Sequence, residues 1–146
     1  MSAKLRLAAP DDLPKLDKLM AACHAELKIK LDDDARTMAL SPLLDGQVPG
    51  AAYLIGPPSS PVGYVLLRFG YSVQDGGMVA RIDELFIRPP VRGREMASEA
   101  LRSVAKTLRA GGIASLQADL PDGAPEKLFR RLLFKVSAQN HAHLAL

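Results

Sequence analysis

The sequence has few of the features that mark a secreted or membrane protein. Cys23 is its only cysteine, which excludes an internal disulfide or a zinc site built from thiolates and is typical of a reducing cytoplasm. No apolar run approaches the roughly 20 residues that cross a bilayer. The N-terminal residues have no continuous apolar segment before their first acids, so no secretory signal is expected. We therefore expect a cytoplasmic protein without a membrane partner.

The sequence also has little excess charge. Its 19 Lys and Arg residues against 16 Asp and Glu residues give a net charge of +3. A nucleic-acid interface needs cations clustered on one face, so no nucleic-acid partner is expected. A small anionic ligand or a solvated basic surface would each account for the mild excess.

Several well-known catalytic and metal motifs are missing. The sequence has no Ser-His-Asp signature and no Walker loop. His141 and His143 lie two residues apart without further ligands beside them, so no metal site is expected. Cys23 falls on the apolar face of a predicted helix and is expected in the core rather than as a nucleophile. His24 lies off that face and is expected to be exposed.

The pattern of apolar residues predicts one domain, residues 1–146, because 48% hydrophobic content supports a sizeable core. An Asp-Gly-Gly turn at residues 75–77 predicts an antiparallel pair from the segments on either side of it. The predicted strands cover residues 4–9, 51–55, 62–71, 79–88 and 113–120, with a weaker closing pair at 135–137 and 141–146.

Helical spacing predicts four helices. The first covers residues 13–27, and a second, short helix through Leu40 is capped by the acids at positions 32–34. A third follows residue 95 and is ended by Gly111 and Gly112, and a short fourth begins at Pro125. Strands in a meander followed by alternating helices and strands indicate an α+β fold, or mixed α/β sandwich.

A basic turn, VRGREMA at residues 91–97, joins a predicted strand to the third helix. A helix N-terminus offers unpaired N–H groups and partial positive charge to an anion. Gly93 lets a ligand approach the backbone, and Arg92 and Arg94 add forked donors suited to phosphate oxygens. The turn predicts phosphate binding; an ordinary strand-to-helix turn with exposed arginines is the alternative.

Two neighbouring acids, Asp83 and Glu84, interrupt the apolar strand before that turn. Side chains alternate along a strand, so the two acids are expected to point to opposite faces. At least one then faces a covered surface or a cleft, where a carboxylate is costly unless it is paired or functional. They are candidates for a general base or an anchor for a substrate amine. An ion pair with Arg81 or Arg88 is the alternative.

Together these segments resemble the GNAT superfamily of acetyl-CoA-dependent N-acetyltransferases. The family motif, Arg/Gln-x-x-Gly-x-Gly/Ala before a helix, falls on RGREMA at residues 92–97. The resemblance covers most of the chain. The family's first strand and helix resemble KLRLAAPDDLPKLDKLM, its third strand resembles PVGYVLLRFGYS, and its last helix and turn resemble LFRRLLF. It implies a GNAT-like fold with a twisted, mostly antiparallel sheet of about six to seven strands and helices on both faces.

The resemblance also implies a function. Such proteins move an acetyl group from acetyl-CoA to a primary amine of a small molecule or peptide, and they are frequently homodimers. Asp83 and Glu84 match the position of the catalytic base. The pantetheine arm would pair with the strand and the pyrophosphate would lie on the turn, which makes the implied cofactor-binding residues Leu85, Phe86, Ile87, Arg92, Gly93, Arg94, Glu95, Met96 and Ala97.

Three residues depart from the family pattern. Glu95 replaces the central glycine of the turn, where its side chain either repels a pyrophosphate or swings outward. Phe129 replaces a tyrosine that often protonates the leaving thiolate. Leu133 replaces a glycine after the last helix, so a different turn is expected there. These departures support an alternative, a catalytically weak or inactive acyl-CoA-binding regulatory module of the same fold.

Overall fold

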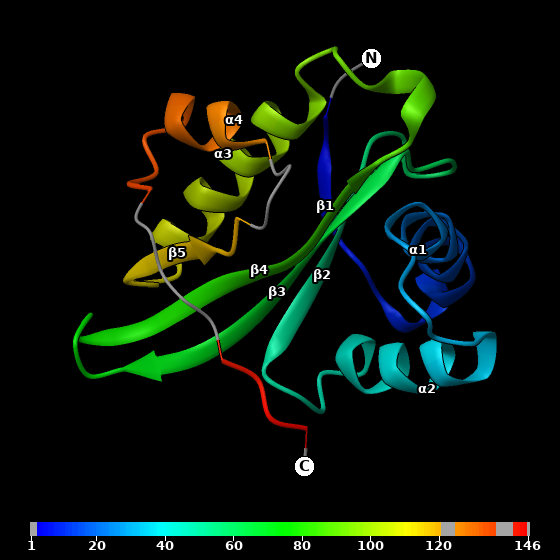
Figure 1. Ribbon diagram of the computed structural model, residues 1–146, viewed down its shortest axis with the longest axis horizontal. Helices are drawn as coiled ribbons and strands as arrows, with labels where there is room; N and C mark the ends of the chain where they lie inside the picture. Colours follow the sequence, from blue (N-terminus) through cyan, green and yellow to red (C-terminus); the bar gives the residue numbers. More distant parts are fainter. Residues whose placement is uncertain (1–2, 121–124, 137–141, 146) are drawn as a thin grey trace.

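The computed structural model describes residues 3–120, 125–136 and 142–145. A five-stranded sheet in the order β1-β2-β3-β4-β5 forms its centre (Figure 1). Neighbouring strands are antiparallel except β4 and β5, which are parallel. The strands are β1 (Leu5–Leu7), β2 (Gly50–Ile55), β3 (Gly63–Ser72), β4 (Gly77–Ile87) and β5 (Ser115–Ala118).

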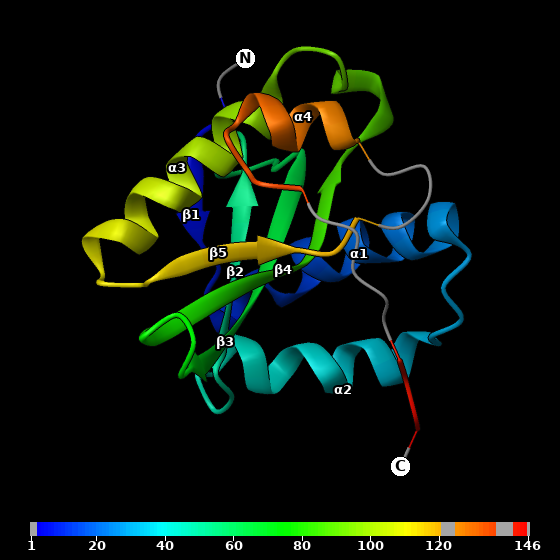
Figure 2. The same cartoon turned by 60° about the vertical axis from the view of Figure 1, so that its left-hand side comes forward.

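Helices cover both faces of the sheet, as expected. Figure 2 shows α1 and α2 on one side of the strands and α3 and α4 on the other. The alternation of β3 fills both layers, because Tyr64 and Leu66 pack under α1 and α2 while Val65 and Leu67 pack under α3. The helices are α1 (Leu13–Leu27), α2 (Asp33–Leu44), α3 (Met96–Ala110) and α4 (Glu126–Arg131), with short 3-10 turns η1 (Pro10–Asp12) and η2 (Pro89–Val91).

The helix ends follow the sequence signals closely. Pro14 lies in the first turn of α1, where a missing N–H costs nothing. The Asp32 side chain accepts the N–H of Ala35 at 2.8 Å and caps α2, as the acidic triplet predicts. α2 continues past Leu40 through Pro42 to Leu44. None of the helices in the described residues combines the length and apolarity needed to cross a bilayer.

The described sheet has five strands rather than the expected six to seven. The difference lies in the closing pair expected at residues 135–137 and 141–146. Lys135, Val136 and residues 142–145 are not in strand conformation, and the other residues of that pair lie outside the described part of the chain.

A β-bulge in β4 sets the geometry of the site. Leu66 lies opposite Glu84 and Leu67 opposite Ile82, so Asp83 is an extra residue on β4. The pairing of β4 with β5 ends at the same point, since its last partners are Ile82 and Ala118. From Asp83 onward, within the described residues, β4 is paired on its β3 side alone.

Candidate active site

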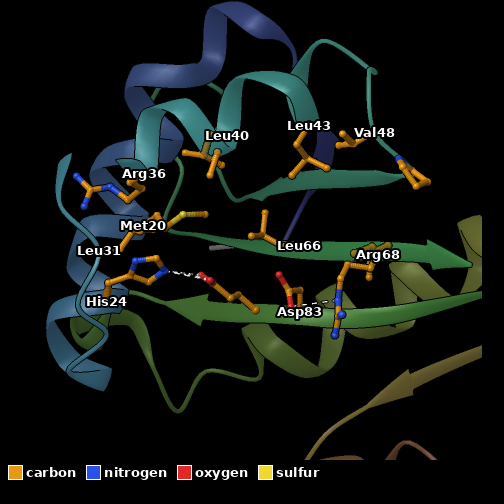
Figure 3. Close-up of a pocket in the computed structure, with 14 residues that line it drawn as sticks. Met20, His24, Leu31, Arg36, Leu40, Leu43, Val48, Leu66, Arg68 and Asp83 are labelled. Atoms are coloured by element: carbon orange, nitrogen blue, oxygen red, sulfur yellow. Dashed lines mark hydrogen bonds and ion pairs between the residues drawn. The ribbon is translucent and has the colours of Figure 1, made fainter. Parts of the chain in front are cut away.

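Both acids of β4 line one cavity of about 370 Å³ on the α1 and α2 face of the sheet (Figure 3). The expectation that Asp83 and Glu84 point to opposite faces is therefore wrong. The physical reason is the bulge, because an extra residue breaks the strict alternation of side chains. The sequence carries no signal for this bulge, which depends on how β3 and β4 pair.

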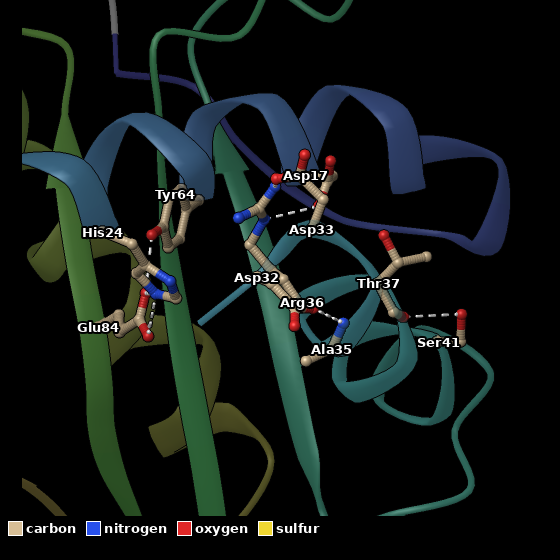
Figure 4. Close-up of polar contacts among 10 residues, drawn as sticks. All are labelled: Asp17, His24, Asp32, Asp33, Ala35, Arg36, Thr37, Ser41, Tyr64 and Glu84. Carbon is tan, nitrogen blue, oxygen red and sulfur yellow. Dashed lines mark hydrogen bonds and ion pairs between the residues drawn. The ribbon is translucent and has the colours of Figure 1, made fainter. Parts of the chain in front are cut away.

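Glu84 is held by two side chains from neighbouring elements (Figure 4). The Tyr64 hydroxyl on β3 donates to its Oε1 at 2.7 Å. His24 on α1 places Nε2 at 3.1 and 3.0 Å from the two carboxylate oxygens. The Glu84 side chain is 19% exposed, so the carboxylate is largely enclosed but still reaches the cavity.

His24 is buried, with only 5% of its surface exposed, so the expectation that it is exposed is wrong. It follows Met20 by one helical turn, and both residues face the sheet. A carboxylate can only accept, so Nε2 carries the hydrogen and donates to Glu84. Nδ1 is buried without a partner among the described residues.

Tyr64 and Cys23 complete the buried surroundings of Glu84. Burial raises the pKa of the Tyr64 hydroxyl, which therefore remains a hydrogen-bond donor. Burial likewise raises the pKa of the Cys23 thiol, and the residue belongs to the core under α1, as expected. Sequence reasoning missed Tyr64 and His24 as site residues. The only signal for Tyr64 was a polar ring in an apolar strand.

Asp83 is the more exposed of the two acids. Its side chain is 45% exposed and forms an ion pair with Arg68 at 3.2 Å. Arg81, one of the partners considered for these acids, instead bonds Asp119 at 2.6 Å. The ion-pair alternative therefore applies to Asp83, with a different arginine, while Glu84 is held by the Tyr64 hydroxyl and the His24 ring.

The basic turn presents a row of unpaired backbone donors. The N–H groups of residues 93–98 have no acceptor among the described residues, and the first bond into α3 is that of Glu99 N–H to the Glu95 carbonyl at 3.0 Å. Gly93 has a φ of 77° and Glu95 a φ of 59°, both in the left-handed region. Such backbone concavities bind anions. The turn thus has the geometry that the pattern predicts for a phosphate site.

Glu95 occupies this left-handed position at a cost. A side chain there destabilises the backbone by about 1–2 kcal/mol relative to glycine. The Glu95 side chain is exposed and caps no N–H group of α3. Glu95 is also the residue that replaces the central glycine of the family pattern, and glycine adopts this conformation most easily.

Arg92 does not stand free in the turn. Its guanidinium bonds both carboxylate oxygens of Glu26 on α1, at 2.7 and 2.6 Å. Its Nε donates to the Ile87 carbonyl at 2.8 Å, and its Cζ lies 5.6 Å from the centre of the Phe86 ring. The arginine lowers the pKa of the Glu26 carboxyl. Arg92 therefore links α1 to the turn, and a phosphate would compete with Glu26 for it.

The remaining predicted cofactor residues differ in what they offer. The Arg88 N–H donates to Val62 at 2.8 Å on the β3 side, so by alternation the peptide groups of Leu85 and Ile87 face the open side of β4. Three of these residues have side chains buried in the core, so these side chains cannot contact a ligand: Phe86, Ile87 and Met96. Arg94 is exposed and Ala97 is half-buried.

Leu133 takes a φ of 69°, so the turn after α4 keeps a conformation that glycine adopts most easily. The expectation of a different turn is therefore wrong. Phe129 is buried and packs edge-on against Phe134, with ring centres 5.1 Å apart. It has no proton to give to a thiolate.

Within the described residues, no group of three or more His, Cys, Asp or Glu side chains could hold a metal ion. His141 lies outside those residues.

Comparison with solved structures shows the fold. An integron cassette protein from the mobile metagenome of Cole Harbour Salt Marsh is 29% identical, with a TM-score of 0.86 over 97% of this chain and 90% of that chain. A predicted acetyltransferase from Clostridium acetobutylicum, solved with acetyl-CoA, is 12% identical, with a TM-score of 0.78 over 97% and 95% of the two chains.

A third similar structure is an aminoglycoside acetyltransferase from an uncultured soil metagenomic sample in complex with sisomicin. It is 16% identical, with a TM-score of 0.76 over 98% and 94% of the two chains. No protein-family model and no curated protein sequence matches the chain. The chain thus has the fold of the GNAT acetyltransferases, as its sequence resemblance indicated.

Proposed function

We propose that this chain, with its GNAT acetyltransferase fold, transfers an acetyl group from acetyl-CoA to a primary amine. The observation that carries the proposal is the position of Glu84. Its carboxylate is held by Tyr64 and His24 on the wall of a cavity, at the bulge where β4 parts from β5. A largely enclosed carboxylate beside an open strand edge suits a base that acts on a bound ammonium.

The open side of β4 and the basic turn would hold acetyl-CoA. The N–H and carbonyl of Leu85 and the N–H of Ile87 face the side on which β4 has no strand partner among the described residues, and can pair with an extended pantetheine arm. The Ile87 carbonyl already accepts from Arg92. The unpaired N–H groups of residues 93–98 can receive the pyrophosphate. Arg92 would exchange Glu26 for a phosphate oxygen as the co-substrate binds.

The reaction begins with a substrate ammonium beside Glu84, which takes one proton and leaves a neutral amine. The amine nitrogen then bonds to the thioester carbonyl carbon, and the carbon–sulfur bond breaks with its electron pair leaving on sulfur. The nitrogen gives up its second proton to water and becomes the amide nitrogen, while Glu84 returns the first proton to solvent. Water protonates the thiolate, because Phe129 has no hydroxyl. Tyr64 and His24 act as positioning residues that hold the Glu84 carboxylate directed at the amine.

Two measurements test this proposal. Calorimetry with acetyl-CoA should show binding that a Gly93→Asp variant weakens, because a carboxylate in the turn repels the pyrophosphate. Release of free coenzyme A thiol should then depend on adding a primary amine, and mass spectrometry should find that amine heavier by one acetyl group. Absence of acetyl-CoA binding at millimolar concentration contradicts the proposal.

A second candidate is an acyl-CoA-binding module without catalysis. Phe129 favours this candidate, because its side chain has no proton to give to a leaving thiolate. This candidate predicts acetyl-CoA binding with no amine-dependent thiol release across a broad panel of primary amines.

A further inference from the structure

The cavity beside Glu84 has a wall that is apolar over most of its extent. α1, α2 and β3 contribute Met20, Leu40, Leu43 and Leu66 to it (Figure 3). At the rim, Leu31 and Val48 expose apolar surface, 38% and 43% of each residue. Exposed aliphatic side chains around a concave apolar surface are typical of a site for an apolar ligand.

Among the described residues, the charged groups of the cavity leave one carboxylate without an arginine or lysine partner. Arg36 is buried and donates to Asp17 at 2.8 Å and to Asp33 at 2.7 Å, so its charge is balanced at the side of the cavity. Asp83 is paired with Arg68 at 3.2 Å. Glu84 instead accepts from the Tyr64 hydroxyl and the His24 ring.

We propose that the acceptor is a monocationic primary amine with an apolar body, an alkyl or aryl group on the order of ten heavy atoms. The size follows from the cavity volume of about 370 Å³ and the roughly 30 Å³ that each water molecule occupies in the liquid. The single ammonium pairs with Glu84, and the apolar body lies against α2 and β3. This inference rests on the proposed acetyl transfer, whose acceptor it names by class.

A polycationic acceptor fits this cavity poorly. A second ammonium would lie among leucine side chains or near Arg36 and Arg68, and the other carboxylate of the cavity wall, Asp83, is already paired with Arg68. The structurally similar aminoglycoside acetyltransferase was solved with sisomicin, so the shared fold by itself does not decide between these acceptors.

The first test compares acceptors in the amine-dependent thiol-release assay. The specificity constant kcat/KM for 2-phenylethylamine should exceed those for spermidine and sisomicin by at least about tenfold, since discrimination reflects differential binding of the acceptor. A higher kcat/KM for spermidine or sisomicin than for 2-phenylethylamine overturns the inference, although acetyl transfer itself would then stand.

The second test changes the cavity rim. Val48→Glu adds a carboxylate at an exposed rim position and should lower the preference for 2-phenylethylamine over spermidine by about tenfold. Val73→Glu is the matched control, because Val73 is 85% exposed in the turn between β3 and β4 and does not line the cavity. An unchanged preference in Val48→Glu, or an equal change in both variants, contradicts the assignment.

A binding measurement separates this inference from the proposed reaction. Calorimetry of 2-phenylethylamine and spermidine is carried out with the full chain, with and without coenzyme A. If no amine is acetylated, the proposed reaction fails. The cavity assignment still holds if 2-phenylethylamine binds more tightly than spermidine and Glu84→Gln weakens it. It is overturned if 2-phenylethylamine does not bind or if spermidine binds more tightly.

Discussion

At the acceptor end of the proposed site, Glu84 lies within a hydrogen-bond network, whereas the phosphate end is an exposed turn whose arginine, Arg92, is engaged elsewhere. Tyr64 and His24 already donate to Glu84. Arg92, by contrast, bonds Glu26. The difference suggests that the acceptor end is organised before any ligand arrives, while the phosphate end must exchange partners during binding.

The largest effect is expected at the acceptor end. Glu84→Gln keeps an oxygen that accepts from Tyr64, so the fold should persist, but it removes the base and should lower kcat by about 10²–10⁴-fold. Asp83→Asn should change kcat much less, because that acid is exposed and paired with Arg68. Steady-state thiol release with melting curves for each variant measures both. A kcat that falls in Asp83→Asn and is retained in Glu84→Gln would reverse the assignment.

The next largest effect is expected at the phosphate end. Glu95→Gly removes a carboxylate from the turn and should tighten acetyl-CoA binding by about tenfold, or about 1.4 kcal/mol. It also relieves the left-handed strain, so the free protein should melt at a higher temperature. Calorimetry and thermal unfolding report the two effects.

Glu95→Gln is the control that separates charge from backbone strain. It removes the charge but keeps a side chain at φ 59°. We expect most of the gain in affinity and none of the gain in melting temperature. If Glu95→Gly leaves the affinity unchanged, the native carboxylate already points away from the pyrophosphate.

Sequence reasoning predicted the strand–turn–helix around Gly93 better than the surroundings of Glu84. The turn and α3 are local, since Gly93, the basic residues and the following helix are adjacent in the chain, and the glycine pattern marked position 95 as unusual. The acceptor end depends on contacts between distant segments. His24 meets Glu84 only because α1 packs across the bulge of β4, and that bulge arises from the register between β3 and β4. No local pattern encodes that pairing.

The expected strand count shows the same limit. The five strands that were confirmed have clear alternation or turn residues at their ends. The closing pair at residues 135–137 and 141–146 had weaker patterning, and its described residues are not strands. The turn at Leu133 was also misjudged, because the fold keeps a left-handed residue there in spite of its side chain.

A smaller effect is expected at Leu133, which shares the strain of Glu95 but not its charge. Leu133→Gly removes the free-energy cost of a left-handed side chain at an exposed position. Glycine also has more conformational entropy in the unfolded chain, which offsets part of this gain, so the net stabilisation should be about 0.5–1 kcal/mol. Lys127→Gly, within α4, is the matched control and should destabilise by about 1 kcal/mol. Urea unfolding measures both changes. Destabilisation by Leu133→Gly would mean that its side-chain contacts outweigh the strain.

The smallest effect is expected for the pair that holds Arg92 away from the phosphate site. Glu26→Gln frees the guanidinium and should tighten acetyl-CoA binding by a few-fold, since an exposed ion pair is a weak competitor. The pair lowers the pKa of Glu26 in the folded protein, so its stabilising effect is present above the unfolded pKa and is lost as pH falls through the folded pKa. Wild type should therefore melt slightly above Glu26→Gln near pH 7, and this difference should vanish in acid. A melting difference that persists in acid would show that Glu26 stabilises the link between α1 and the turn by packing rather than by its charge.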